Sequence, residues 1–359
     1  MLNNYYIQLD GLRALAVFGV MTSHWITLPI VQKTGSGFWG VNLFFVLSGF
    51  LITEILLKQI AKKELPARIL RSFYIKRSLR IFPIYYIVII FAFILNLDGS
   101  RGITEFTLTY TLNFHNSITG EVGNYLSHIW SLCVEEQFYI LLPFLLLMVG
   151  SRYHLFFIIT AIVLSLIFRL FTVIYRIEHF DIYNYRMMPA CLDALGLGSL
   201  LAYCKLYKQE TLKKVLNYNF IPVVCFLLFV CIVTFAQLPT WINEVFLRFV
   251  VSLCCLFIIG KAVIGYNNLF GKILGHPLLR FFGRISYGLY LYHLIVSALL
   301  QNSLQEFIIF YTPSIFPEFI QHNIFVITAP VYFIITLLIA TVSYYYIENP
   351  FMKLKSRIV

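Results

Sequence analysis

Long apolar runs separated by short polar segments are the dominant pattern along the chain. A bilayer core about 30 Å thick is crossed by a helix of roughly 20 predominantly apolar residues. The runs that approach this length lie at about residues 11–31, 39–59, 82–97, 129–149, 153–175, 189–206, 219–237, 245–265, 285–305 and 325–347. The third is short, and the sixth begins in a polar segment. The pattern predicts an all-α protein, a polytopic membrane helical bundle of about ten transmembrane helices.

The composition agrees with a membrane protein. Of the 359 residues 60% are apolar and only 12% are charged, and the mean hydropathy is +0.83. Soluble domains are about 45–50% apolar and roughly 25% charged, so a soluble enzyme, a disordered chain and a nucleic-acid module are excluded. The seven cysteines lie in or beside apolar runs without disulfide or zinc spacing, and we expect them in the core. No repeat or linker divides the chain, so residues 1–359 are predicted to form one membrane domain.

Basic residues gather in alternate connections between the runs. Cytoplasmic loops of membrane proteins carry an excess of Lys and Arg. With the N-terminus inside, most of the 27 Lys and Arg residues fall in inner loops, the densest group lying between Lys58 and Arg80. Both termini are therefore predicted to be cytoplasmic. The formal charge of +11 is then mainly a topology signal. No cleavable signal is expected, because the first apolar run begins almost at once and contains Arg13.

Ionisable residues inside the apolar runs are candidates for function, since each costs about 2.5–3.5 kcal/mol at the centre of a membrane helix. The first run carries Arg13 near its inner boundary and His24 in its outer half, ~16 Å further along a helix. The fourth run has the opposite direction and places Glu135 and Glu136 at a similar depth. A His near a carboxylate is the usual combination of a general base and its orienting partner.

Only one of the two glutamates is expected to face His24, because neighbouring helical residues point about 100° apart. A structural role is the alternative, with the His bonded to a neighbouring helix and the glutamates reaching interfacial water. His293, in an aromatic run, is more typical of helix packing. The supporting candidates are Asp10, Ser48, Glu136 and Asp193. Ser48 precedes a glycine near mid-membrane, where close helix packing is the favoured role.

A second candidate site is basic. Arg77 and Arg80 are three residues apart and share one face if the segment is helical. Forked guanidiniums suit a phosphate-bearing ligand better than lysines do. An ordinary basic loop at anionic lipid headgroups is the alternative. The sequence has no Walker loop, GxGxxG or GxSxG motif, so ATP-driven transport and serine-hydrolase chemistry have no support.

Six strings, in this order, carry a resemblance to a known family. They are LDGLRALAVFGVMTSHW, FFVLSGFLI, YIKRSLRIFPIYY, IWSLCVEEQFYILLP, ISYGLYLYHL and YYYIENPF. From about residue 6 to 351 the chain resembles the integral-membrane acyltransferase family called acyltransferase-3. The resemblance implies a ten-span protein of the cell inner (cytoplasmic) membrane. It also implies O-acylation of cell-surface glycans, usually with acetyl groups from cytoplasmic acetyl-CoA.

The resemblance also implies roles for individual residues. It gives His24 an essential role in an Arg-x10-His motif, gives Arg77 and Arg80 a donor-binding role in an Arg-x-x-Arg motif, and favours Glu135 over Glu136. Some relatives carry an extra extracytoplasmic hydrolase-like domain. Here the chain stops soon after its last apolar run, so we expect such a partner to be a separate protein.

The residues and the resemblance together predict a mechanism. Arg13, Arg77 and Arg80 would bind acyl-CoA at the inner mouth, and His24 would act as general base with Glu135 fixing its tautomer. An acyl-enzyme formed on His24 or on a tyrosine is the mechanistic alternative. No metal and no permanently bound cofactor is expected. The outer connection 98–128 is a candidate part of the acceptor site.

The substrates stay open at this stage. The acceptor is expected to be a hydroxyl of a cell-surface or lipid-linked polysaccharide, and the donor group can be acetyl or another acyl group such as succinyl. The alternative function is a transporter or flippase for a lipid-linked saccharide without acyl transfer. A sensor or scaffold with a vestigial site is a third reading.

Overall fold

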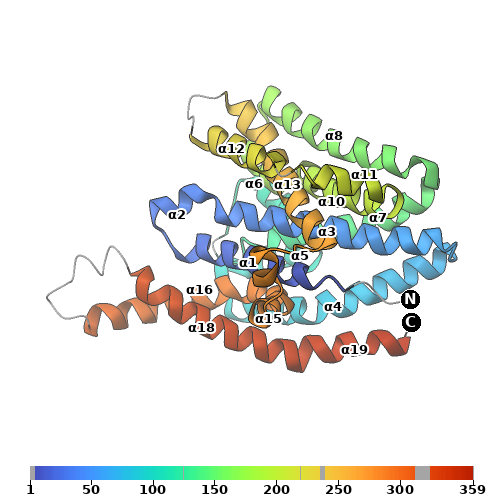
Figure 1. Ribbon diagram of the computed structural model, residues 1–359. Helices are drawn as coiled ribbons and strands as arrows, with labels where there is room; N and C mark the ends of the chain where they lie inside the picture. Colours follow the sequence, from blue (N-terminus) through green and yellow to red (C-terminus); the bar gives the residue numbers. More distant parts are fainter. Residues whose placement is uncertain (1–4, 124, 219, 235–238, 312–323, 359) are drawn as a thin grey trace.

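A computed structural model describes residues 5–358 except 124, 219, 235–238 and 312–323, and the described residues form helices and no strand (Figure 1). The long helices are α1 (Ile7–Trp25), α3 (Ser36–Ala61), α4 (Pro66–Leu95), α7 (Ile129–Met148), α8 (His154–Ile174), α10 (Met188–Tyr207), α12 (Phe220–Thr234), α13 (Thr240–Ile264), α16 (Ser286–Tyr311) and α18 (Phe325–Ser343). The short helices are α2 (Pro29–Thr34), α5 (Thr104–Leu108), α6 (Leu112–Thr119), α9 (Phe180–Arg186), α11 (Gln209–Leu216), α14 (Leu269–Leu274), α15 (Pro277–Arg284) and α19 (Asn349–Ile358).

Each of the ten predicted apolar runs coincides with a long helix, although the end of run 219–237 lies outside the described residues. In the described part of the chain, seven helical segments are long and apolar enough to cross a membrane, or eight if the bent pair Gln209–Leu216 and Phe220–Cys231 is one span. Helices α1 and α16 carry polar side chains and are not among the seven. The protein is therefore an all-helical, multi-pass membrane protein, and the count of ten crossings stays a prediction.

Helices α1, α3 and α10 pack closely through small residues. A Cβ added at Gly40 of α3 would lie 2.4 Å from the Ala16 carbonyl oxygen of α1. One added at Gly49 would lie 2.0 Å from the Leu195 carbonyl oxygen of α10. Such contacts leave no space for a side chain, which is how small residues bring membrane helices together. The packing role expected around Ser48 is thus confirmed for its neighbour Gly49.

Helix α4 joins the basic segment to the third apolar run. The sequence predicted a short span at 82–97, whereas α4 is one 30-residue helix that begins at Pro66 and contains Pro83. Neighbouring helices satisfy backbone groups freed by a proline, so membrane helices tolerate it. Because the segment is helical, Arg77 and Arg80 share one face of α4, as the spacing predicted.

One end of the bundle holds the end of α1 and the beginning of α3. These two helices are joined through α2, and a Cβ on Gly37 would lie 2.3 Å from Ser23 Oγ. The start of α1 and helix α19 lie at the opposite end (Figure 1). Since His24 follows Ser23, it lies at the end where α3 begins.

The seven cysteines are free thiols. Five are buried, as expected for core residues, whereas Cys231 is exposed and Cys204 is half-buried. The core prediction is therefore correct for five of them and wrong for Cys231.

Candidate active site

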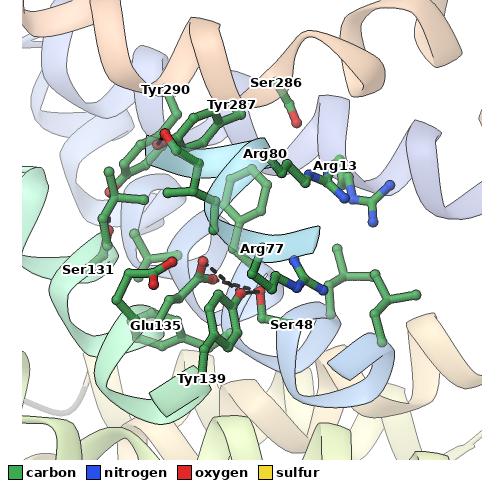
Figure 2. Close-up of a pocket in the computed structure, with 18 residues that line it drawn as sticks. Arg13, Ser48, Arg77, Arg80, Ser131, Glu135, Tyr139, Ser286, Tyr287 and Tyr290 are labelled. Atoms are coloured by element: carbon green, nitrogen blue, oxygen red, sulfur yellow. Dashed lines mark hydrogen bonds between the residues drawn. The ribbon is translucent and has the colours of Figure 1, made fainter. Parts of the chain in front are cut away.

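A cavity of about 920 Å³, including the space at its mouth, lies among α1, α3, α4, α7 and α16 (Figure 2). Its polar and charged lining residues are Arg13, Ser48, Arg77, Arg80, Ser131, Glu135, Glu136, Tyr139, Ser286, Tyr287 and Tyr290. The cavity thus brings together six residues that the sequence singled out from four separate segments. His24 is not among the residues that line it.

Three arginines line the cavity. Arg13 Nη1 lies 2.8 Å from Asp10 Oδ1, and this buried carboxylate also accepts a hydrogen bond from Tyr5. Arg77 lies over the ring of Tyr139, 5.0 Å from its centroid. In the described part of the chain neither Arg77 nor Arg80 has a carboxylate oxygen within 4.0 Å. Two guanidiniums therefore remain available to bind an anionic ligand.

The two glutamates of α7 have different surroundings. Glu135 Oε1 accepts a hydrogen bond from Ser48 Oγ at 2.7 Å, and its Oε2 lies 3.1 Å from the Tyr139 hydroxyl. That hydroxyl also donates to Ser48 Oγ at 2.9 Å (Figure 2). Glu136 is buried, and its Oε1 has no hydrogen-bond partner. Glu135 therefore belongs to a three-residue polar group on the wall of the arginine cavity.

His24 lies in a cluster of histidines instead of beside Glu135. Its Nδ1 is 3.0 Å from Nε2 of His293, whose Nδ1 is 2.6 Å from the Tyr290 carbonyl oxygen. The His128 ring follows at 4.9 Å from the His293 ring, and its Nε2 is 3.2 Å from the Leu291 carbonyl oxygen. His24 is exposed, whereas His128 and His293 are buried. We call these three residues the histidine row.

The predicted pairing of His24 with Glu135 is therefore wrong. Depth along two helices locates residues only along the membrane normal, and it does not give the direction in which each side chain points. His293 of α16 is the residue that contacts His24. The sequence favoured a helix-packing role for His293, and that role does not account for this contact. Among the described residues no carboxylate oxygen lies within 4.0 Å of a ring nitrogen in the histidine row.

Tyr290 separates the arginine cavity from the histidine row. It lines the cavity, and its hydroxyl is 2.6 Å from Ser131 Oγ and donates to the His128 carbonyl oxygen at 3.1 Å. Its ring centroid is 5.5 Å from that of His128 and 5.7 Å from that of His293. The cavity and the histidine row are thus direct neighbours. Sequence reasoning did not identify Tyr139, Ser131 or Tyr290, although Tyr139 lies one turn after Glu135.

Asp193 is located elsewhere. Its Oδ2 is 2.6 Å from Arg169 Nη2, both side chains are fully buried, and the pair connects α8 to α10. It does not line the cavity. An enclosed ion pair of this kind connects two helices, so Asp193 supports the bundle and not the candidate site.

Within the described ranges, no three His, Cys, Asp or Glu side chains are grouped to hold a metal ion.

Comparisons with known proteins extend this description. A family model described as an acyltransferase domain matches residues 6–345. The peptidoglycan O-acetyltransferase OatA of Listeria monocytogenes is 31% identical over 97% of this chain and 56% of the relative. The O-acetyltransferase OatA of Staphylococcus aureus is 30% identical over 97% of this chain and 57% of the relative. The chain spans 56–58% of the length of the curated relatives it matches. Among solved structures there is no match.

Proposed function

The chain belongs to the acyltransferase family whose model it matches, and we propose that it is a membrane O-acyltransferase. In this proposal an acetyl or similar acyl group moves from cytoplasmic acyl-CoA to a hydroxyl of a cell-surface or lipid-linked polysaccharide. The observation that carries the proposal is the adjacency of an arginine-lined cavity and a histidine base on the two sides of Tyr290. The protein would lie in the cell inner membrane with ten crossings and both termini cytoplasmic.

The arginine cavity is the proposed donor site. CoA is a large polyanion, and Arg13, Arg77 and Arg80 provide guanidinium groups that bind phosphate oxygens in pairs. Arg77 and Arg80 have no carboxylate partner within the described residues, so an anionic ligand gains their charge without breaking an ion pair.

The hydrogen bonds of the histidine row assign a tautomer to His24. A carbonyl oxygen only accepts, so Nδ1 of His293 carries a hydrogen and donates to Tyr290. Nε2 of the neutral His293 ring is then an acceptor, and His24 Nδ1–H donates to it. This order leaves Nε2 of His24 with a free lone pair. His293 would therefore orient His24 as the Asp does in a catalytic triad.

His24 Nε2 is the proposed general base. It takes the proton of the acceptor hydroxyl while that oxygen attacks the thioester carbonyl. The carbon–sulfur bond then breaks, and the imidazolium returns the proton to the departing thiolate. The products are the ester and free CoA. The imidazolium that forms in between shares its Nδ1 hydrogen with His293.

Glu135 keeps a proposed role that differs from the predicted one. Its carboxylate orients Ser48 and Tyr139 beside Arg77 on the wall of the donor cavity. Tyr139 is also the tyrosine through which a covalent route would run, with an acyl-tyrosine as the intermediate. Incubation with labelled acetyl-CoA alone separates the two routes, because only the covalent one leaves label on the protein.

Reconstituted protein tests the proposed function. The purified chain in lipid nanodiscs is incubated with radiolabelled acetyl-CoA and a polysaccharide acceptor, and label in the glycan is counted. Acyl transfer that His24→Ala abolishes supports the proposal. Transport of a lipid-linked saccharide across proteoliposomes without consumption of acetyl-CoA, and unaffected by His24→Ala, would instead identify a flippase.

A further inference from the structure

A second cavity, of about 800 Å³ including the space at its mouth, lies between α3, α9 and α13. Phe38 in the first turn of α3 and Glu244 in the second turn of α13 both line it. Phe38 follows Gly37, which packs against Ser23, the neighbour of His24. The cavity therefore lies at the end of the bundle that carries His24. Val122 also lines this cavity. It belongs to the connection 98–128, which the sequence predicts as a candidate part of the acceptor site.

Two buried arginines line this cavity. Arg186 and Arg248 are 8% and 3% exposed. Arg186 Nη1 donates to Asn116 Oδ1 at 2.9 Å, and Arg248 donates to Asn42 Oδ1 at 3.1 Å and to the Tyr185 carbonyl oxygen at 2.7 Å. All three acceptors are neutral. Nε of Arg248 is buried without a hydrogen-bond partner.

Arg186 and Arg248 differ from Arg169, which forms a buried ion pair with Asp193. In the described part of the chain neither Arg186 nor Arg248 has a carboxylate oxygen within 4.0 Å. Arg248 lies 5.4 Å from the ring centroids of Phe38 and Tyr185, and Arg186 lies 5.8 Å from that of Trp130. These cation–π contacts offset part of the cost of burying the two charges, and the unpaired Nε of Arg248 adds the cost of a buried donor without an acceptor. A ligand with several oxygen atoms would offset both costs.

The remaining lining residues select the class of ligand. Asp181 is exposed and Glu244 is half-buried, and both supply carboxylate acceptors around the cavity. Half-buried aromatic rings of Phe38 and Tyr185 stack at 5.9 Å between centroids and add apolar surface. Donors, acceptors and aromatic surface together match the hydroxyl groups and carbon faces of a sugar. Two carboxylates in the lining disfavour a polyanion such as pyrophosphate.

Aromatic residues connect this cavity to the proposed reaction centre. Tyr185 lines the second cavity, and its ring lies 4.9 Å from that of Trp130 at the start of α7. The next residue, Ser131, lines the arginine cavity and contacts Tyr290. Tyr185 of the second cavity therefore contacts the direct chain neighbour of a residue that lines the arginine cavity.

We propose that the second cavity is a saccharide-binding subsite, which holds a neutral sugar unit of the acceptor glycan near His24. The inference rests on the proposed function, because it supplies the acceptor side of the same transfer. Its determinants are the two buried arginines and the carboxylate and amide groups of Asp181 and Asn243.

Direct binding to the full chain in nanodiscs tests the subsite. The probe is chitotetraose, a neutral tetrasaccharide, followed by saturation-transfer NMR, with inorganic pyrophosphate as the anionic competitor. Asp181→Asn and Asn243→Ala each change a side chain that is not fully buried, so the fold should tolerate them. We expect each to weaken chitotetraose binding about tenfold, because Asn243→Ala removes a hydrogen-bonding amide and Asp181→Asn replaces a charged acceptor with a weaker neutral one. Glu306→Gln, an exposed carboxylate of α16 outside the cavity, is the matched control and should leave binding within about twofold of the unmodified chain.

The outcomes separate this inference from the proposed function. Three results would overturn the subsite: no saturable chitotetraose binding, binding by both cavity variants as tight as by the unmodified chain, or binding of pyrophosphate tighter than that of chitotetraose. Binding that the cavity variants weaken, in a protein that transfers no acetyl group from acetyl-CoA, would support the subsite and contradict the proposed function. His24→Ala should bind chitotetraose as the unmodified chain does, because His24 does not line the cavity.

Discussion

The two sides of Tyr290 are built from opposite kinds of side chain. On one side an open cavity collects three guanidiniums, two of which have no carboxylate partner among the described residues. On the other side His128 and His293 are buried, and the hydrogen bonds of His293 go to a carbonyl oxygen and another imidazole. Charge suits the binding of a polyanionic donor, and a row of imidazoles suits a base that must accept and then release a proton. In the proposed function, acyl-CoA binding and proton transfer are therefore separated in space.

The largest expected effect is on the histidine side. His24→Ala removes the general base and should lower the rate of acetyl transfer by about 10²–10⁴-fold. Binding of acetyl-CoA should stay within about twofold, because His24 does not line the arginine cavity. Transfer rates and acetyl-CoA titrations of the same preparation check both parts. His115→Ala, in α6 and outside both cavities, is the control for the loss of an imidazole.

The arginine side should give the converse result. Replacing both Arg77 and Arg80 with Ala should weaken acetyl-CoA binding by about 10²–10⁴-fold, since two charged hydrogen bonds of about 1.5–3 kcal/mol each sum to about 3–6 kcal/mol. The binding of acetyl-CoA by the unmodified chain should weaken with added salt more steeply than that of the variant. Arg152→Ala, an exposed arginine of the segment 151–153, is the matched control. A variant with normal acetyl-CoA affinity and a reduced transfer rate would contradict the separation of roles.

A smaller effect is expected for the residue that orients the base. His293→Leu removes the acceptor for His24 Nδ1–H and should lower the maximal rate by about 10–10²-fold, within the range for positioned acid–base catalysis. His293→Gln retains an acceptor oxygen and should restore part of the rate. If His293 had only a structural role, the Gln and Leu variants would have equal transfer rates whenever their thermal stabilities were equal. Equal rates of the two variants would therefore remove His293 from the mechanism.

The smallest effect is expected for Tyr139→Phe. Direct transfer needs only the contact of Tyr139 with Glu135 and Ser48, so loss of the hydroxyl should lower the rate less than about tenfold, the effect of one ordinary hydrogen bond. An acyl-tyrosine route would lose its nucleophile, and transfer would stop. Mass spectrometry of the protein after incubation with acetyl-CoA alone gives an independent answer.

The sequence predicted the helices well and the site in part. Apolar runs located the ten long helices of the described residues, of which seven are long and apolar enough to cross a membrane, or eight if the bent pair is one span. The spacing of Arg77 and Arg80 gave their common helical face. The resemblance to the acyltransferase-3 family pointed to Arg77, Arg80 and Glu135, which line one cavity, and to His24, which does not. Periodicity was sufficient for the helices and the shared face, whereas the roles of the site residues came from the resemblance.

The sequence alone did not predict which residue contacts His24 or that Asp193 lies outside the cavity. Both depend on how helices are rotated about their axes and on which helices are neighbours, and hydropathy contains neither. Glu135 lies at a suitable depth but points to Ser48 and Tyr139. His293 comes from a helix 269 residues away along the chain. Asp193 sits in a predicted membrane run, yet its buried partner Arg169 was not connected to it by any sequence pattern.

The tautomer of His24 is the most direct test of the central claim, since the hydrogen bonds through His293 assign it and the proposed base depends on it. The measurement is the pair of ¹⁵N chemical shifts of His24 in histidine-labelled protein at pH 8, well above the reference pKa of about 6.5, with the His24→Gln variant used for assignment. We expect hydrogen on Nδ1 and an unprotonated Nε2. Hydrogen on Nε2 would contradict it, because the exposed nitrogen would then have no lone pair to accept a proton.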